Sequence, residues 1–338
     1  MAQHHKSSCP PPLPNQQPQQ SRIGIIGGMS YASAKTYYME LNRLTQETAA
    51  KRGLNPLTSC DLILRSVNFA EIEELQKQGD WARAGEILAD CAAELRAGGA
   101  EFVILATNTM HKDKCAEAIE RKLGECESFL PATGAKLNQD KGSRNSDHQL
   151  KSSLSSPGSS DAASDAGAGG DAASIDEQHE SSDTHTYAIE SQNHRSDENK
   201  GKARFLHLAD ATASAIKKAG FQKPGLMATA YTMEQDFYKS RLQNQGLEVL
   251  IPGEEDRKEC HRIIFEELCK NIIKDNSRTA YEEIAGRLKE NGADCLILGC
   301  TEVGLLLSLE NSPLPPFDTA LIHCEAAVAR AFAGEEQA

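Results

Sequence analysis

The sequence lacks long apolar runs and basic stretches, and each absence excludes a class of protein. No segment of the 338 residues is apolar over the length needed to cross a bilayer. The formal net charge is -13, and Lys and Arg are nowhere concentrated as binding to nucleic-acid phosphates would require. The composition is 39% hydrophobic, which is enough to build real cores. We therefore expect a globular protein with no nucleic-acid or membrane partner.

Motifs for metals and nucleotides are also missing. The ten cysteines include no Cys-x-x-Cys pair and have no histidines at zinc-finger spacing, which favours free thiols in a cytoplasmic setting. The glycines of "GIIGG", residues 24–28, do not form the G-x-G-x-x-G pattern of dinucleotide sites. We expect no metal and no nucleotide cofactor.

Two segments have compositions that oppose folding. Residues 1–21 are rich in Pro and Gln and lack the apolar core of a signal peptide. Residues 137–203 are rich in Ser, Asp, Ala and Gly and have few large apolar side chains. Such segments cannot bury enough surface to offset the entropy of ordering them. We predict a disordered leader at 1–21 and a disordered low-complexity insertion at 137–203.

The rest of the sequence repeats one plan. "RIGIIGGMS" from Arg22 and "KPGLMATAY" from Lys223 each precede a helical pattern, and "GAEFVILATNTMH" (99–111) later matches "GADCLILGCTEVG" (292–304). Strands that alternate with helices favour parallel sheets covered on both faces. We predict two duplicated Rossmann-like α/β/α domains with three layers each. The first comprises residues 22–130, 204–218 and 313–338, and the second comprises residues 219–312.

Between these landmarks, the pattern of apolar residues predicts further elements. "CDLILRSVNF" (60–69) is predicted as a buried strand and "LEVLIP" (247–252) as its counterpart. "DWARAGEILADCAAELRAGG" (80–99) is predicted as a helix that stops at its terminal glycines. "FEELCKNIIK" (265–274) is predicted as a solvated, charged helix face.

Small polar residues follow the matched strands, in the tripeptides Thr107-Asn108-Thr109 and Cys300-Thr301-Glu302. Ligands of α/β sheets bind at the carboxyl ends of the strands, so two domains that face each other would bring both tripeptides to one cleft. Each tripeptide also precedes a plausible helix, whose N-terminus could hold a carboxylate or lower the pKa of a thiol. The sequence therefore predicts a small-molecule site between the domains.

Four motifs resemble those of the aspartate/glutamate racemases that work without a cofactor. They are "GGMS" (27–30), "TNTMH" (107–111), "YTMEQDFY" (231–238) and "LGCTE" (298–302). The resemblance covers nearly all of residues 22–130 and 204–333. Most members of this family have Cys where this chain has Thr107, a departure that resembles the branch specific for L-aspartate and L-glutamate.

The resemblance implies an isomerase, independent of pyridoxal phosphate, that racemises L-aspartate and L-glutamate by proton exchange on opposite faces of Cα. A thiol has an ordinary pKa of about 8.5 that its surroundings can lower, whereas a threonine hydroxyl is a far weaker acid. We therefore expect Cys300 to act as the base and Thr107 to donate or relay a proton.

The resemblance also implies eight substrate-binding residues. The glycine turn would present two of them, three others would hold a carboxylate, and Glu302 would accept from the ammonium group or orient Cys300. His111 is expected to be a packing or capping residue, with a supporting role behind the site as the less favoured alternative. The eight are Met29, Ser30, Gln76, Asn108, Thr109, Thr229, Thr301 and Glu302.

Two other functions stay open at this point. A relative with one working cysteine could be a decarboxylase of malonate-like acids or a maleate-type isomerase. A chain with threonine in place of the first cysteine could instead bind acidic amino acids without turning them over. The resemblance also makes a homodimer an expectation.

Overall fold

The structure is a computed structural model that describes residues 20–125 and 204–333. All of these residues belong to one compact unit. The predicted insertion, and all but the last two residues of the predicted leader, lie outside the described residues.

The first half of the fold is a parallel sheet of three strands in the order β2-β1-β3. The central strand is completely buried, and its side chains alternate between the two faces of the sheet: Ile23 and Ile25 lie in one apolar cluster and Ile26 in the other. The three strands of this sheet are β1 (Ile23–Gly27), β2 (Leu62–Ser66) and β3 (Phe102–Leu105).

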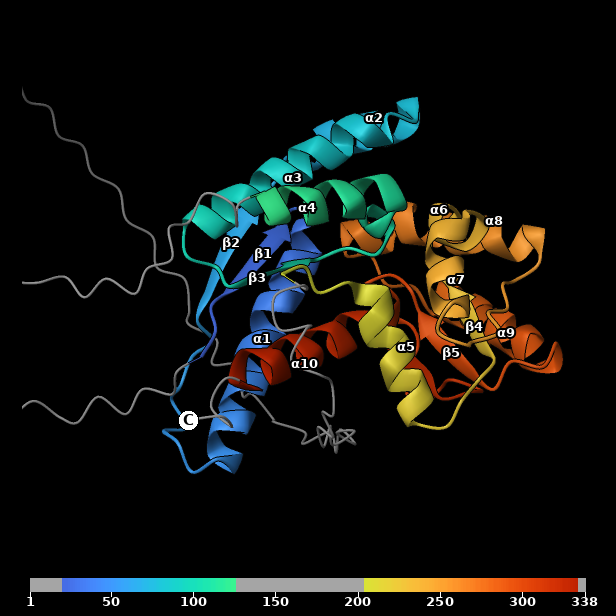
Figure 1. The fold of residues 1–338 in the computed structure, drawn as a ribbon. Coiled ribbons are helices and arrows are strands. Elements are labelled where there is room, and N and C mark those ends of the chain that lie inside the picture. The colour runs from blue at the N-terminus through green and yellow to red at the C-terminus, as the bar shows by residue number, and fades with distance from the viewer. Residues whose placement is uncertain (1–19, 126–203, 334–338) are drawn as a thin grey trace, which may run out of the picture. The chain divides into compact units, whose positions relative to one another are not determined.

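Helices cover both faces of this sheet (Figure 1). On one face, α3 (Trp81–Ala97) packs against the sheet and against α4 (Asp113–Glu125). On the other face, α1 (Tyr31–Lys51) packs against α10 (Thr319–Phe332), although nearly the whole chain separates them in sequence. The short helix α2 (Phe69–Gln78) lies beside α3.

The second half has the same plan, with a parallel sheet in the order β4-β5-β6. Its strands are β4 (Pro224–Met227), β5 (Cys295–Leu298) and β6 (Pro316–Asp318). One continuous apolar cluster joins this sheet to its helices, which are α5 (Leu208–Lys218), α6 (Ala230–Glu234), α7 (Asp236–Gln243), α8 (Glu254–Glu266) and α9 (Asp275–Glu290).

The predicted α/β architecture with parallel sheets is therefore confirmed. The predicted helix over 80–99 is also confirmed, since α3 ends where Gly98 caps it and Gly99 takes a positive φ of 93°. Within the described ranges, no helix combines the length and the apolar character needed to cross a membrane.

Three local predictions differ from the structure. The segment 60–69 forms an edge strand and not a buried one, and Leu64 is 42% exposed there. The segment 247–252 contributes only an isolated bridge, between Leu250 and Gly225, because its chain leaves the sheet after one pairing. The segment 313–338, assigned to the first domain, is divided: β6 pairs with β5 in the second sheet, while α10 packs on α1.

Candidate active site

The two matched strands, β3 and β5, end in tight turns of 3-10 helix. The first turn, η1, spans Thr109–His111, and the second, η4, spans Val303–Leu305. The helix expected after the first tripeptide is α4 (Asp113–Glu125), which begins only beyond η1, and the second tripeptide is followed by η4, so neither tripeptide adjoins the N-terminus of an α-helix. A three-residue turn aligns few peptide dipoles, so it offers little of the charge stabilisation that a long helix provides at its N-terminus.

One cavity of about 470 Å³, counted to its opening, lies at these strand ends. Both tripeptides line it, and so does the turn that follows β1. All ten residues predicted for the site contribute to its wall. They are Met29, Ser30, Gln76, Thr107, Asn108, Thr109, Thr229, Cys300, Thr301 and Glu302.

Glu302 is the centre of a hydrogen-bond network that joins the two halves. Its Oε1 accepts from the hydroxyls of Ser30, at 3.0 Å, and Ser33, at 3.2 Å, both from the first half. Its Oε2 accepts from the Cys300 thiol at 3.0 Å and from the Thr301 hydroxyl at 2.5 Å. The carboxylate is almost fully buried, and four donors compensate for its lost solvation.

This arrangement raises the pKa of Cys300 well above its ordinary value. Burial of the thiol is the largest cause, and the neighbouring Glu302 carboxylate adds to it. The expectation that a helix N-terminus would lower the pKa of this thiol is therefore opposed by the geometry. Cys300 is accordingly a protonated thiol that donates to Glu302.

Asn108 has its side-chain amide oriented by a buried chain of donors. The Thr319 hydroxyl donates to the Leu298 carbonyl at 2.8 Å, so its oxygen can accept from Asn108 Nδ2 at 3.1 Å. Asn108 Oδ1 has no donor among the described residues, although the side chain is buried at the cavity wall. A ligand that donates a hydrogen bond would satisfy this oxygen.

Hydroxyl and amide groups form the rest of the polar wall. The hydroxyls of Thr109 and Thr229 lie 3.3 Å apart, each from a different half. Gln76, from α2, directs its Nε2 to the sulfur of Met110 at 2.9 Å. Thr107 is half-buried at the end of β3, and its carbonyl oxygen lies 2.7 Å from Nδ1 of His111.

Six further residues line the cavity that the sequence did not predict. Ser33 could have been found from the sequence, because it lies three residues after Ser30, which caps the helix and was itself predicted for the site. Cys269 had the opposite signal, since it lies within the segment 265–274 that was predicted to be a solvated helix face. The six are Ser33, Phe69, Ile264, Phe265, Cys269 and Gly299.

The prediction for 265–274 is confirmed only in part: residues 270–274 are exposed, but the helix breaks after Glu266 and the residues that follow it turn inward. α8 ends at Glu266, and a 3-10 turn, η3 (Leu268–Lys270), then directs the chain inward. Glu267 is buried and accepts from the Ser277 hydroxyl at 2.6 Å and from Arg262 at 2.8 Å. Cys269 consequently lies against the cavity together with two apolar side chains of α8.

The cavity wall carries little charge. Of the described residues that line it, Glu302 alone is charged, and none is Lys or Arg. Nor do the described residues include any group of three or more His, Cys, Asp or Glu side chains placed to hold a metal ion. The polar wall consists of hydroxyls, amides, two thiols and one carboxylate.

A parallel α/β fold with one polar cavity at the carboxyl ends of two matched strands places the chain among α/β proteins that bind a ligand at their strand ends. This chain belongs to the Asp/Glu/hydantoin racemase family, whose model matches residues 203–327. The family is one of isomerases, and the predicted resemblance is confirmed at this level.

Solved structures show the same relationship. The chain is 33% identical to a "putative Asp/Glu racemase" from Yersinia pestis, with a TM-score of 0.63 over 92% of this chain and 99% of that one. It shares its fold with an aspartate racemase homologue from Pyrococcus horikoshii, at 24% identity and a TM-score of 0.58 over 92% of this chain and 99% of that one. An uncharacterised protein encoded in the pnlA 3' region of Pectobacterium carotovorum is 28% identical over 109 residues, which is 32% of this chain and 71% of that protein.

Proposed function

We propose that this protein racemises L-aspartate and L-glutamate without a cofactor, by proton transfer on opposite faces of Cα. One observation supports the proposal above the others: Thr107 and Cys300, at the ends of matched strands from the two sheets, line the same cavity. A substrate held between them would offer its α-proton to a thiol on one side and a hydroxyl on the other.

Cys300 is the base in this proposal, and Glu302 makes it competent. The thiol donates to a carboxylate 3.0 Å away, so that carboxylate can receive its proton when the substrate binds. The substrate ammonium group, placed beside Glu302, offsets the negative charge that raises the pKa of the thiol. The resulting thiolate takes the α-proton, and Thr107 relays a proton drawn from solvent water to the opposite face. Glu302 releases to solvent the proton that it accepted from Cys300, so the protons balance over the reaction and the carboxylate stays available to the ammonium group.

Orientation of the substrate follows from the donors and acceptors of the wall. Glu302 and the unsatisfied Oδ1 of Asn108 are acceptors, and both suit the ammonium group. The hydroxyls of Thr109 and Thr229 can donate to a substrate carboxylate, whereas the Thr301 hydroxyl donates to Glu302. This assignment gives Asn108 an ammonium partner, where the sequence alone led us to expect a carboxylate.

The weak acidity of Thr107 does not make the reaction one-way. Enantiomers have equal free energies in water, and both directions pass through the same transition state. The two directions must therefore have equal kcat/KM, and a preference for the L-substrate can appear only in kcat and KM separately.

The test uses L-aspartate and L-glutamate in deuterium oxide. We expect loss of the α-proton signal by NMR and the appearance of D-enantiomer by chiral chromatography. The Cys300→Ala variant should lose at least about 10³-fold in turnover. Cys269→Ala, which removes the other thiol of the same cavity, should retain turnover within about fivefold of the wild type.

Other outcomes would support the alternatives. Binding of an acidic amino acid by calorimetry without exchange or inversion would favour a silent binder. Turnover of a malonate derivative alone would favour the decarboxylase. L-asparagine and L-glutamine belong in the same panel, because the cavity wall has no cation and these amides match the acids in size. Turnover of the amides without the acids would keep the racemase and overturn its substrate assignment.

A further inference from the structure

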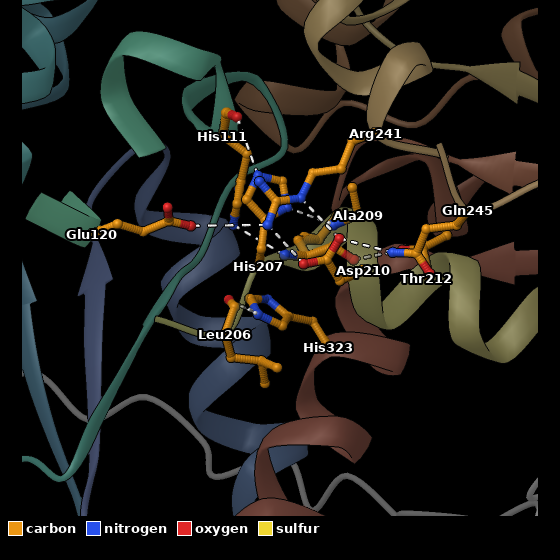
Figure 2. Close-up of polar contacts among 11 residues, drawn as sticks. His111, Glu120, Leu206, His207, Ala209, Asp210, Thr212, Arg241, Gln245 and His323 are labelled. Atoms are coloured by element: carbon orange, nitrogen blue, oxygen red, sulfur yellow. Dashed lines mark hydrogen bonds and ion pairs between the residues drawn. The ribbon is translucent and has the colours of Figure 1, made fainter. Parts of the chain in front are cut away.

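Three buried histidines lie behind the catalytic strand end and line no part of the cavity. This histidine cluster comprises His111, His207 and His323, each at most 2% exposed (Figure 2). Burial is the main cause that lowers the pKa of all three: well below the ordinary value for His111, to about 3 for His207 and to about 4 for His323. All three are therefore neutral imidazoles near pH 7.

The hydrogen bonds of His111 define which nitrogen has its proton. Nδ1 lies 2.7 Å from the carbonyl oxygen of Thr107, which can only accept, so Nδ1 donates. Nε2 accepts from the backbone N–H of Leu208 at 3.2 Å. Each nitrogen of His111 thus has one partner, and the Thr107 partner is the backbone of the residue proposed to relay a proton.

The chain segment that meets His111 from the other side is 205–208, where the described chain resumes after residue 203 (Figure 2). Phe205 stacks on the His111 ring, with centroids 5.4 Å apart and planes 19° apart. His207 directs its Nε2 at the His111 carbonyl, at 3.3 Å, and its Nδ1 accepts from the N–H of Ala209. The imidazole of His111 is therefore held on its face and at both nitrogens.

Thr107 needs an external support of this kind. β3 ends at Leu105, and the last sheet hydrogen bond on this strand is from the Ala106 N–H to the Ile26 carbonyl. Beyond it, the Thr107 N–H turns back to the Leu105 carbonyl at 2.9 Å, so no neighbouring strand orients this peptide. The Nδ1–H of His111 supplies the hydrogen bond that the Thr107 carbonyl accepts.

We propose that His111 is a positioning residue, whose Nδ1 proton orients the Thr107 backbone and through it the hydroxyl that faces the substrate. The inference rests on the proposed racemase function. A displacement of about 1 Å at a reacting group can cost two orders of magnitude in rate, so loss of this one hydrogen bond reduces turnover. Substrate binding depends on other residues of the wall and is largely unchanged.

A matched pair of amide variants tests this role. In His111→Asn, the side-chain nitrogen reaches the place of Nδ1 and keeps the bond to Thr107. In His111→Gln, the longer amide reaches the place of Nε2 and keeps the partner Leu208 instead. We expect His111→Gln to lower kcat about tenfold or more with KM within about twofold, and His111→Asn to retain most of the wild-type kcat.

His323→Asn is the control for the loss of a buried imidazole. His323 directs Nε2 at the Leu206 carbonyl, at 3.0 Å, and Nδ1 at the Tyr37 hydroxyl, at 2.8 Å, and contacts no residue of the cavity wall by these bonds. Thermal unfolding should show a loss of stability in this variant comparable to that of the His111 variants, while kcat stays within about twofold of the wild type.

Three results would overturn the inference. The two His111 variants could have equal kcat, whether both retained or both reduced; His323→Asn could lose as much kcat as His111→Gln; or His111→Gln could raise KM alone. Absence of exchange and of D-product in the wild type would instead remove the proposed function, which keeps the two failures distinct.

Discussion

At the scale of single residues, the site depends on a balance between Glu302 and Cys300. The carboxylate binds four donors, one of which is the thiol proposed as the base. The same negative charge helps to raise the pKa of that thiol. Glu302 therefore disfavours the thiolate of Cys300 and offers a partner for the ammonium group of a substrate.

Replacing Glu302 by Gln should make the free Cys300 more acidic. The variant removes a like charge from beside the thiolate, and the new amide N–H can donate to it, so the pKa of Cys300 falls. The alkylation rate of Cys300, followed by mass spectrometry of its peptide, rises with pH as the thiolate forms. We expect that rise at lower pH in Glu302→Gln than in the wild type. An unshifted or upward-shifted profile would contradict the coupling.

At the scale of elements, the turn between β1 and α1 presents Met29 and Ser30 to the cavity. Gly28 makes this turn possible, because its φ is 99° and a Cβ there would lie 2.4 Å from the Val67 carbonyl oxygen and 2.7 Å from Ser66 Oγ. Ser30 then begins α1, and its hydroxyl accepts from the N–H of Ser33. The geometry of one glycine thus places two donors to Glu302.

Replacing Gly28 by Ala should destabilise the protein by about 3 kcal/mol or more, because it combines backbone strain with a steric clash against backbone atoms. Gly79→Ala is a matched control: Gly79 has a φ of 73°, yet nothing lies within 4 Å of a Cβ there. It should cost about 1–2 kcal/mol, from the strain alone. Urea unfolding of both variants checks the difference, and equal losses would show that the clash relaxes.

At the scale of the whole molecule, buried polar groups join elements that are far apart in sequence. The histidine cluster connects η1, the segment 205–208 and α10. Beside it, Arg241 of α7 pairs with Asp210 of α5 through two hydrogen bonds of 2.8 and 2.7 Å and lies 3.9 Å from Glu120 of α4 (Figure 2). These contacts link helices of both halves around the same strand end.

The neutral histidines should make the fold sensitive to acid. The pKa of His323 is about 4 in the folded protein, against an ordinary 6.5. Because the pKa of His323 is lower in the folded protein, the unfolded chain binds the proton first as the pH falls. The free energy of unfolding is therefore unaffected above pH 6.5 and decreases as the pH falls from 6.5 to 4. That loss amounts to about 3 kcal/mol for this residue.

His323→Gln cannot titrate, so its stability relative to the wild type should improve by about 3 kcal/mol between pH 7 and pH 4. Denaturant unfolding of both proteins at each pH provides the measurement. The Gln side chain can still donate to the Leu206 carbonyl, which limits the loss at neutral pH. A difference between the two proteins that does not change with pH would show that His323 is not the linked group.

Much of the fold could be predicted because its signals are local. The apolar strands around Gly24 and Gly225, the terminal glycines of α3 and the repeated strand ends all lie within short windows of sequence. The edge position of β2 and the break after Glu266 could not be predicted. Both depend on which surfaces of the folded molecule remain uncovered, and no short window contains that information.

The candidate site divides in the same way. Thr107 and Cys300 were identifiable because both follow apolar strands of the same plan, and all ten predicted residues line one cavity. Cys269 was missed because its neighbours in sequence are charged, while its neighbours in space belong to the cavity wall. The fold, and not the neighbouring sequence, decides which side chains surround Cys269.

The amino-acid sequence by itself determined the parallel α/β plan, its duplication and the residue types at the two strand ends, because periodicity and turn chemistry act over a few residues. Tertiary structure alone decided the protonation state of Cys300 and the second partner of His111. The pKa of a thiol depends on how much water and how much charge surround it, and Glu302 and the cavity wall provide both conditions only after folding. Likewise, His111 reaches Leu208 only when the segment 205–208 has returned to the edge of β3.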